Sequence, residues 1–219
     1  MKGGGYPGTF LYTANGADYI REIADEDNLP LDRVIATGHS AGGHLTGWLA
    51  SRKKIQEVSP LYSKNPVEIY GVISLAGINN LESYANYGSA PCGDQTVEKL
   101  VNIEDRDNAY ADTSPAELLP LGVPFIEVKA AFDSPVPPFF GYQFIQAAKK
   151  TGDSAHHILL EKSGHFEMIH SGTDEWSKIR PLFESIIEMN YLGAEPTRYL
   201  SDFNLLLFPT QWVGELNHL

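Results

Sequence analysis

A serine, an aspartate and a histidine are spaced along the chain in surroundings that suit nucleophilic catalysis. Ser40 lies at the centre of Gly38-His39-Ser40-Ala41-Gly42, which fits the pattern G-x-S-x-G. A serine hydroxyl becomes a good nucleophile when a base removes its proton and an acid orients that base. Asp133 and His165 each lie in a loop that follows a predicted strand. We therefore expect Ser40 to be the nucleophile, His165 the base and Asp133 the acid.

A strand that turns directly into a helix at Ser40 is needed to hold the serine. Residues 33–37 form a short apolar run typical of a buried parallel strand, and the sequence becomes helical again after the motif. Such a turn keeps the serine in a strained conformation, and the small Gly38 and Gly42 let strand and helix come close together. We expect the Ala41 amide to donate to an oxyanion, because a helix N-terminus favours negative charge.

Other residues of the same types have weaker claims to these roles. His170 is the rival base because it is close to His165 in sequence, and Asp112 is the alternative acid because it lies between the second and third predicted strands. Glu127 falls within a strand and is less suited to the acid role. We expect His39 to pack within the turn and His44 to be an ordinary helix residue.

The elements around these residues alternate between strand and helix, which indicates βαβ units and a mostly parallel sheet of about four strands flanked by helices. We treat residues 1–189 as one α/β domain and residues 190–219 as an irregular tail, with docking or dimerisation through its apolar residues 205–208 as the alternative. The expected strands are residues 33–37, 69–75, 125–128 and 157–160, and the expected helices are residues 13–26, 45–50, 139–150 and 174–189.

Composition excludes several classes of protein. The 219 residues carry a net charge of −12, so nucleic acid is not an expected partner. We expect Arg52-Lys53-Lys54 to be a solvated helix end. There is neither an apolar run long enough to span a membrane nor a signal-peptide pattern at the start, so we expect a cytoplasmic protein. The single Cys92 is expected to be a loop residue, and no histidine pair has metal-ligand spacing with a third ligand.

These residues resemble the α/β-hydrolase superfamily, and more narrowly its kynurenine formamidase-like and carboxylesterase-like branch. The resemblance runs from Gly3 to about Met189 and follows the family order of serine, then acid, then histidine. Four segments carry it: Gly3-Gly4-Gly5-Tyr6-Pro7-Gly8-Thr9-Phe10, the stretch from Asp32 through the G-x-S-x-G motif to Leu45, Asp133 through Val136-Pro137, and Gly164-His165-Phe166-Glu167.

The resemblance implies a serine hydrolase that acts on small carboxylic esters or amides without a metal or other cofactor. In the formamidase branch the substrate is N-formylkynurenine, which is cleaved to kynurenine and formate. Ser40 would attack the carbonyl, His165 would act as general base with Asp133 orienting it, and the Ala41 amide would stabilise the oxyanion. A small-molecule substrate is the implied partner, and a homo-oligomer is possible. Aromatic residues in nearby loops would suit an aromatic or acyl group: Tyr6, Tyr87, Phe139, Phe140 and Tyr142.

The sequence also departs from the family. Family members have several strands and a His-Gly-Gly loop before the matched segment, and that loop supplies the second oxyanion donor. Without them, the strand at residues 33–37 is expected to be an apolar sheet edge. The Gly3-Gly4-Gly5 segment is a possible substitute anion site. The alternatives to an active hydrolase are therefore a truncated, catalytically weak or inactive relative, or a binding module that keeps the pocket.

Overall fold

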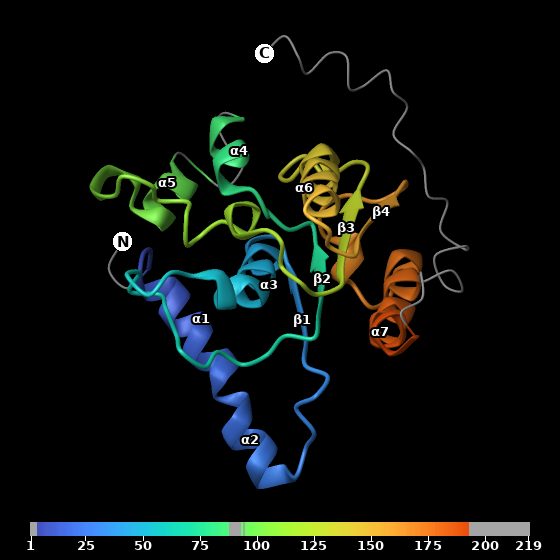
Figure 1. Cartoon of the computed structure of the whole chain (residues 1–219). Helices are drawn as coiled ribbons and strands as arrows, with labels where there is room; N and C mark the ends of the chain where they lie inside the picture. Colours follow the sequence, from blue (N-terminus) through green and yellow to red (C-terminus); the bar gives the residue numbers. More distant parts are fainter. Residues whose placement is uncertain (1–3, 88–92, 94, 193–219) are drawn as a thin grey trace.

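Strands and helices alternate along the chain in the computed structural model, which describes residues 4–87, 93 and 95–192 (Figure 1). The strands are β1 (Ile35–His39), β2 (Gly71–Leu75), β3 (Phe125–Ala130) and β4 (Ala155–Leu160). The α-helices are α1 (Gly8–Asp18), α2 (Ile20–Asp27), α3 (Ala41–Ser51), α4 (Leu81–Asn86), α5 (Thr96–Val101), α6 (Pro138–Lys150) and α7 (Asp174–Leu192). Short 3₁₀ turns are η1 (Arg52–Lys54), η2 (Ile103–Asp105), η3 (Pro115–Leu118) and η4 (Glu167–Ile169).

The four strands form one parallel sheet in the order β1-β2-β3-β4, which is also their order in the chain. All four carboxyl ends therefore lie at the same edge of the sheet, where the loops that leave the strands can meet. Among the described residues β1 pairs with β2 alone, which confirms that residues 33–37 lead into a strand at the sheet edge.

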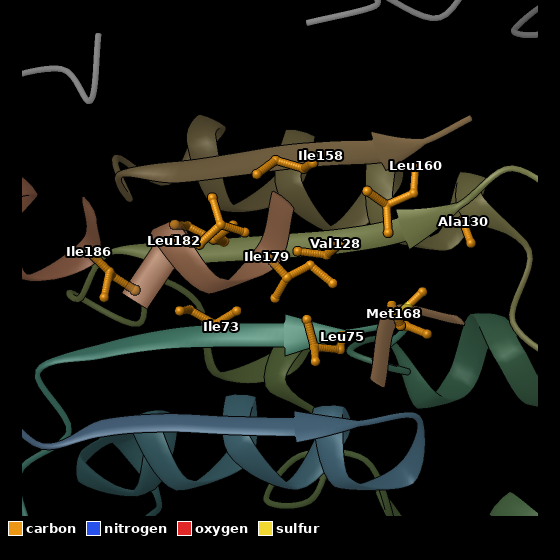
Figure 2. Close-up of a cluster of buried hydrophobic side chains, with 12 residues drawn as sticks. Ile73, Leu75, Val128, Ala130, Ile158, Leu160, Met168, Ile179, Leu182 and Ile186 are labelled. Atoms are coloured by element: carbon orange, nitrogen blue, oxygen red, sulfur yellow. The ribbon is translucent and has the colours of Figure 1, made fainter. Parts of the chain in front are cut away.

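Helices cover both faces of the sheet. Figure 2 shows Ile179, Leu182 and Ile186 of α7 packed over Ile73 and Val128 of the two central strands. The opposite face packs against α3 and α6; α1 lies against α3, and α2 extends from the end of α1 (Figure 1). Since side chains alternate along a strand, β3 contributes to both layers, and this alternation decides where its charged residues point.

The sequence locates the sheet and misplaces one helix. Each predicted strand lies within three residues of an observed one. The helix expected at residues 13–26 is instead two helices, α1 and α2, separated at Tyr19, and it begins at Gly8. Asn28 ends α2 in the left-handed conformation at φ 53°. Ile23 of α2 is 40% exposed, although it lies at helical spacing from Ile20 and next to the buried Ala24.

The basic triplet at the end of α3 is not the solvated helix end that the sequence suggested. Arg52 is buried, and its guanidinium donates to both carboxylate oxygens of Asp18, at 2.9 and 2.7 Å. Lys53 and Lys54 are exposed as expected. Arg52 therefore ties the end of α3 to the end of α1, which holds the helix behind the Ser40 turn in place.

The end of the chain is only partly described. Helix α7 continues to Leu192 and so includes the first residues expected in the irregular tail, while residues 193–219 and Cys92 lie outside the described part. No helix within the described residues is long and apolar enough to span a membrane.

Candidate active site

Ser40 occupies a sharp turn between β1 and α3. Its φ of 57° and ψ of −119° lie in a region that residues other than glycine rarely adopt. The cost of such a backbone is about 1–3 kcal/mol, and strain of this kind concentrates at functional sites. The Ser40 amide donates to the Leu75 carbonyl of β2 at 2.8 Å, which fixes the turn at the carboxyl edge of the sheet. This is the strand–turn–helix geometry that the G-x-S-x-G motif predicts.

Two glycines give this turn its shape. A Cβ on Gly38 would lie 2.6 Å from the carbonyl carbon of Gly42, and a Cβ on Gly43 would lie 2.7 Å from the Cα of Gly77. Both neighbours are backbone atoms, which cannot rotate out of the way. A Cβ on Gly42 would meet nothing within 4 Å. Of the two motif glycines, only Gly38 is therefore required for packing among the described residues.

His165 and Asp133 meet at the same edge. The His165 Nδ1–H donates to Asp133 Oδ2 at 2.8 Å, and both side chains are buried. The other oxygen, Oδ1, accepts the Val136 amide at 2.8 Å. Because an ionised carboxylate only accepts hydrogen bonds, this pairing places the ring proton on Nδ1 and leaves Nε2 free to accept a proton.

The loop after β4 crosses the sheet to reach the serine turn. β1 and β4 are the outermost strands, yet the rings of His39 and His165 lie 4.4 Å apart, centroid to centroid. The His39 Nε2–H donates to the His165 carbonyl at 2.7 Å. Burial lowers the pKa of His39, so its neutral form is favoured. His39 therefore packs within the turn as expected, and it also anchors the backbone of His165 beside Ser40.

The amide of Ala41, the expected oxyanion donor, lies at the start of a helix. Helix α3 begins at Ala41, so this N–H is one of the helix-terminal donors without a partner in the helix. The glycine segment near the start of the chain does not provide a similar donor at Gly5, because the Gly5 amide donates to Thr9 Oγ1 at 2.9 Å. Gly3 lies outside the described residues.

The rival base, His170, and the helix residue, His44, lie in surroundings that differ from those of His165. His170 is exposed, and its Nδ1 accepts the Gly172 amide at 3.3 Å. His44 is buried and its Nε2–H donates to the Thr113 carbonyl at 2.8 Å. Burial lowers the pKa of His44 to about 4, so it is neutral near pH 7. Of the histidines considered as bases, His165 is the one that a carboxylate orients.

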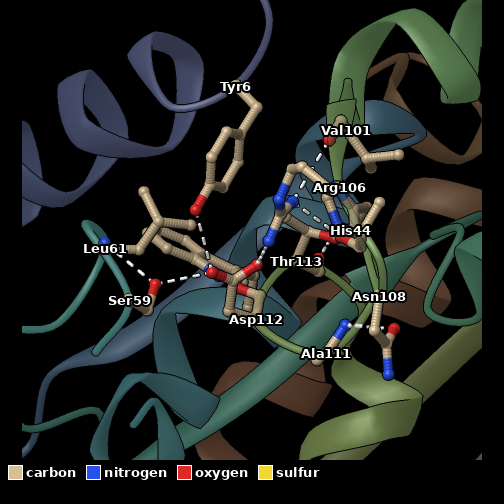
Figure 3. Close-up of polar contacts among 12 residues, drawn as sticks. Tyr6, His44, Ser59, Leu61, Val101, Arg106, Asn108, Ala111, Asp112 and Thr113 are labelled. Carbon is tan, nitrogen blue, oxygen red and sulfur yellow. Dashed lines mark hydrogen bonds and ion pairs between the residues drawn. The ribbon is translucent and has the colours of Figure 1, made fainter. Parts of the chain in front are cut away.

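Asp112, the alternative acid, is the centre of a separate polar cluster (Figure 3). Its Oδ2 accepts the hydroxyls of Tyr6 and Ser59, and its Oδ1 accepts Arg106 Nη2. The Arg106 guanidinium also lies over the Tyr6 ring, 3.6 Å from the centroid. Asp112 thus joins the start of the chain to two loops, and Tyr6 is held in this cluster.

Three other aromatic residues of the expected pocket pack with one another near the start of α6, whereas the Tyr142 ring lies 6.3 Å from that of His157, centroid to centroid. Tyr87 contacts Phe139 and Phe140, with ring centroids 5.3 Å apart in both cases. Phe140 is buried in a core cluster with Tyr84. Phe140 is therefore a packing residue, whereas Tyr87 is 57% exposed. Within the described part of the chain no group of three His, Cys, Asp or Glu side chains could hold a metal ion.

Sequence reasoning missed a buried charged pair below this site. Glu127 and Lys129 lie on β3 with no solvent exposure, and Lys129 Nζ is 3.1 Å from Glu127 Oε1. The available signal was the occurrence of opposite charges two residues apart in an otherwise apolar strand, since such residues share one face.

A family model described as BD-FAE matches residues 6–144, which is more than half of the chain. The chain belongs to the BD-FAE family. The BD-FAE match includes the G-x-S-x-G motif and Asp133, and it ends before His165. No curated protein sequence matches the chain.

Solved structures share the fold of this BD-FAE chain at low sequence identity. A truncated carbohydrate esterase from gut microbiota has a TM-score of 0.66 at 15% identity, over 83% of this chain and 69% of its own. Esterase Est2 of Thermogutta terrifontis, with propionate bound, has a TM-score of 0.62 at 19% identity, over 86% and 67%. Acylaminoacyl peptidase of Pyrococcus horikoshii has a TM-score of 0.63 at 18% identity, over 83% and 28%.

These similarities establish the fold class. The four-stranded parallel sheet between helices is part of the α/β-hydrolase fold. The chain spans about two thirds of the length of the two esterases and about a quarter of the peptidase. The comparisons show the BD-FAE family and the fold, while the narrower kynurenine formamidase branch stays a prediction.

Proposed function

We propose that this chain is a serine hydrolase that cleaves small carboxylic esters through an acyl-enzyme intermediate. One observation carries the proposal: the hydrogen bond between His165 and Asp133 lies at the sheet edge where Ser40 is held in a strained turn. A nucleophile candidate, an oriented base and a buried carboxylate together match the arrangement that activates a serine.

The residues would act in two half-reactions. Ser40 Oγ attacks the ester carbonyl while His165 Nε2 takes its proton, and His165 then gives this proton to the leaving alkoxide. Water attacks the acyl-enzyme in the same way and releases the acid and free Ser40. Asp133 holds the Nδ1–H and stabilises the imidazolium that forms in each half-reaction. The Ala41 amide donates to the oxyanion of both tetrahedral intermediates.

Small acyl esters are the substrate class best supported by the family and its neighbours. The names of two structural neighbours describe a carbohydrate esterase and an esterase with bound propionate, and the family match covers the serine motif. N-formylkynurenine, an amide of formic acid, is the second substrate to test because of the resemblance to formamidases. Ester and formamide hydrolysis would use the same three residues. The rates measured on a small acyl ester and on N-formylkynurenine therefore decide which substrate the chain prefers.

A weak or inactive hydrolase relative is the alternative, and one observation favours it. β1 ends directly before Ser40 and has an unpaired edge among the described residues, so the sheet supports the serine turn from one side only. The family's second oxyanion donor comes from a His-Gly-Gly loop that this sequence does not contain, and the removal of one such donor costs about 100–1000-fold in rate. A folded chain with a complete triad and a very low rate would fit this alternative.

Hydrolysis of p-nitrophenyl acetate by the purified chain tests the proposal. Ser40→Ala and His165→Ala should each abolish activity, whereas Ser154→Ala, an exposed serine before β4, and His170→Ala should retain it. Circular dichroism must show that all variants are folded. Equal rates for the wild type and Ser40→Ala would refute the proposal, and no activity in a folded wild type would favour the weak or inactive relative.

A further inference from the structure

The buried pair Glu127 and Lys129 has no place in the chemistry proposed above. Both side chains have no solvent exposure, and both point from β3 to the face covered by α6. A Cβ on Gly141 of α6 would lie 2.6 Å from Lys129 Cε and 2.9 Å from Glu127 Cγ, so the helix packs directly onto the pair. Charges buried this deeply are costly, and apolar residues of similar size often serve stability as well or better.

The pair forms hydrogen bonds with both backbone polar groups of one residue, Gly77. Glu127 Oε1 accepts the Gly77 N–H at 3.1 Å, and Lys129 Nζ donates to the Gly77 carbonyl at 2.6 Å. Glu127 Oε2 accepts Asn79 Nδ2 at 2.9 Å. The preceding residue, Ala76, has a φ of 51°, so the chain leaves β2 through a strained turn. Both hydrogen-bonding groups of Gly77 are therefore fixed by buried charges.

Gly77 in turn supports the Ser40 turn. The first turn of α3 rests on it so closely that a Cβ on Gly43 would lie 2.7 Å from the Gly77 Cα. Ser74 Oγ donates to the Gly43 carbonyl at 3.4 Å, and the Leu75 carbonyl accepts the Ser40 amide at 2.8 Å. A shift of Gly77 would therefore be transmitted through backbone contacts to Ser40 and to the Ala41 amide.

Burial and hydrogen bonding have opposite effects on Glu127. Burial raises the pKa of this carboxyl, while Lys129, Ser74 and the Gly77 N–H favour its charged form. Removal of one partner alone would leave an uncompensated buried charge, which disturbs folding whatever the pair does. A useful variant must therefore change both residues together.

We propose that Glu127 and Lys129 are positioning residues of the serine turn: they fix Gly77, the backbone on which the first turn of α3 rests, and so set the position of Ser40 and the Ala41 amide. This inference rests on the proposed function. It predicts that the pair contributes to the reactivity of Ser40 separately from its contribution to folding.

The double variant Glu127→Leu/Lys129→Met tests the inference, because it removes both charges and roughly keeps the side-chain volumes. We expect its thermal midpoint to fall, because the Gly77 N–H and carbonyl lose their buried partners. At a temperature where it is folded, its second-order rate of labelling by a fluorophosphonate should be at least tenfold below that of the wild type. In ester hydrolysis kcat should fall with little change in KM. Glu127→Gln/Lys129→Met retains an acceptor for the Gly77 N–H and should recover part of the rate.

Asp153→Asn is the control for a purely structural effect. Asp153 is buried and accepts the Leu121 and Gly122 amides, both at 2.8 Å, before the amino ends of β3 and β4 and away from the serine turn. This variant should lose stability and keep the wild-type labelling rate at a temperature where it is folded.

The outcomes separate the inference from the proposed function. A labelled wild type with a folded double variant labelled at the same rate overturns the inference alone. A folded wild type that is not labelled overturns the inference and the proposed function together. If Glu127→Leu/Lys129→Met does not fold, Glu127→Gln/Lys129→Met provides the same comparison, and a wild-type labelling rate in that variant overturns the inference.

Discussion

The two glycines of the G-x-S-x-G motif should respond very differently to the same substitution. A methyl group on Gly38 would lie 2.6 Å from the Gly42 carbonyl carbon, whereas ordinary contact begins at 3.4 Å. Strand β1 and helix α3 would therefore have to separate by at least about 0.8 Å, since the contacting group of Gly42 is backbone and its carbonyl oxygen lies closer still. A methyl group on Gly42 has open space, so Gly42→Ala is a matched control in the same motif.

The expected magnitudes follow from this geometry. Overpacking of a closely packed site costs about 1–3 kcal/mol, so Gly38→Ala should lower the free energy of unfolding by that amount. A displacement of about 1 Å at a catalytic group costs on the order of 100-fold in rate, so reactivity of Ser40 should fall by a comparable factor. Gly42→Ala should change stability by less than about 1 kcal/mol, because alanine suits a helix at least as well as glycine.

Urea denaturation and p-nitrophenyl acetate hydrolysis measure the two effects separately. Gly38→Ala should be less stable and far slower, while Gly42→Ala should match the wild type in both assays. Equal activity of Gly38→Ala and Gly42→Ala would refute the close packing that we assign to the serine turn. A loss of activity in Gly42→Ala alone would show that the open space beside Gly42 is occupied during the reaction.

Three further predictions follow from other contacts. Asp133→Asn should lower kcat on the order of 10⁴-fold and less than Ser40→Ala does: its oxygen stays with the Val136 N–H, so its NH2 faces His165 Nδ1 and favours the wrong tautomer; equal losses in steady-state kinetics would contradict this. His44 binds its proton near pH 6.5 when unfolded and near pH 4 when folded, so stability should fall by about 3 kcal/mol as the pH drops through that range; an unchanged pH slope of the unfolding free energy in His44→Gln would contradict this. Arg52→Met should cost about 2–4 kcal/mol by urea denaturation because Asp18 loses a buried bidentate partner, and a wild-type midpoint would contradict this.

The sheet could be predicted from the sequence because its strands are short apolar runs between glycines, prolines and helical segments. The run that ends in the motif at Ser40 is the clearest case, because a short apolar run directly before a glycine-rich turn is typical of a parallel strand, although β1 lies at the sheet edge and only Ala36 in it is buried. The helix expected at residues 13–26 was less accurate. Its apolar spacing continues across Tyr19, so periodicity alone does not show that the backbone breaks into α1 and α2 there.

The sequence indicated the residues of the candidate site, but not all the contacts that hold them in place. Asp133 and His165 follow strands of one parallel sheet, so their loops must lie at the edge where Ser40 lies. The contact of His39 with His165 depends on the path of a loop across the sheet, which no local pattern encodes. Arg52 was misjudged for a similar reason, because its partner Asp18 is 34 residues away in sequence.

Covalent labelling of the purified chain by a fluorophosphonate, followed by intact mass and peptide mapping, tests the central claim most directly. That claim is that Ser40 is activated by His165 and Asp133. We predict one adduct per chain, located on Ser40, lost in Ser40→Ala and strongly reduced in His165→Ala while both variants stay folded. A folded wild type without an adduct, or an adduct that persists in Ser40→Ala, would contradict the account.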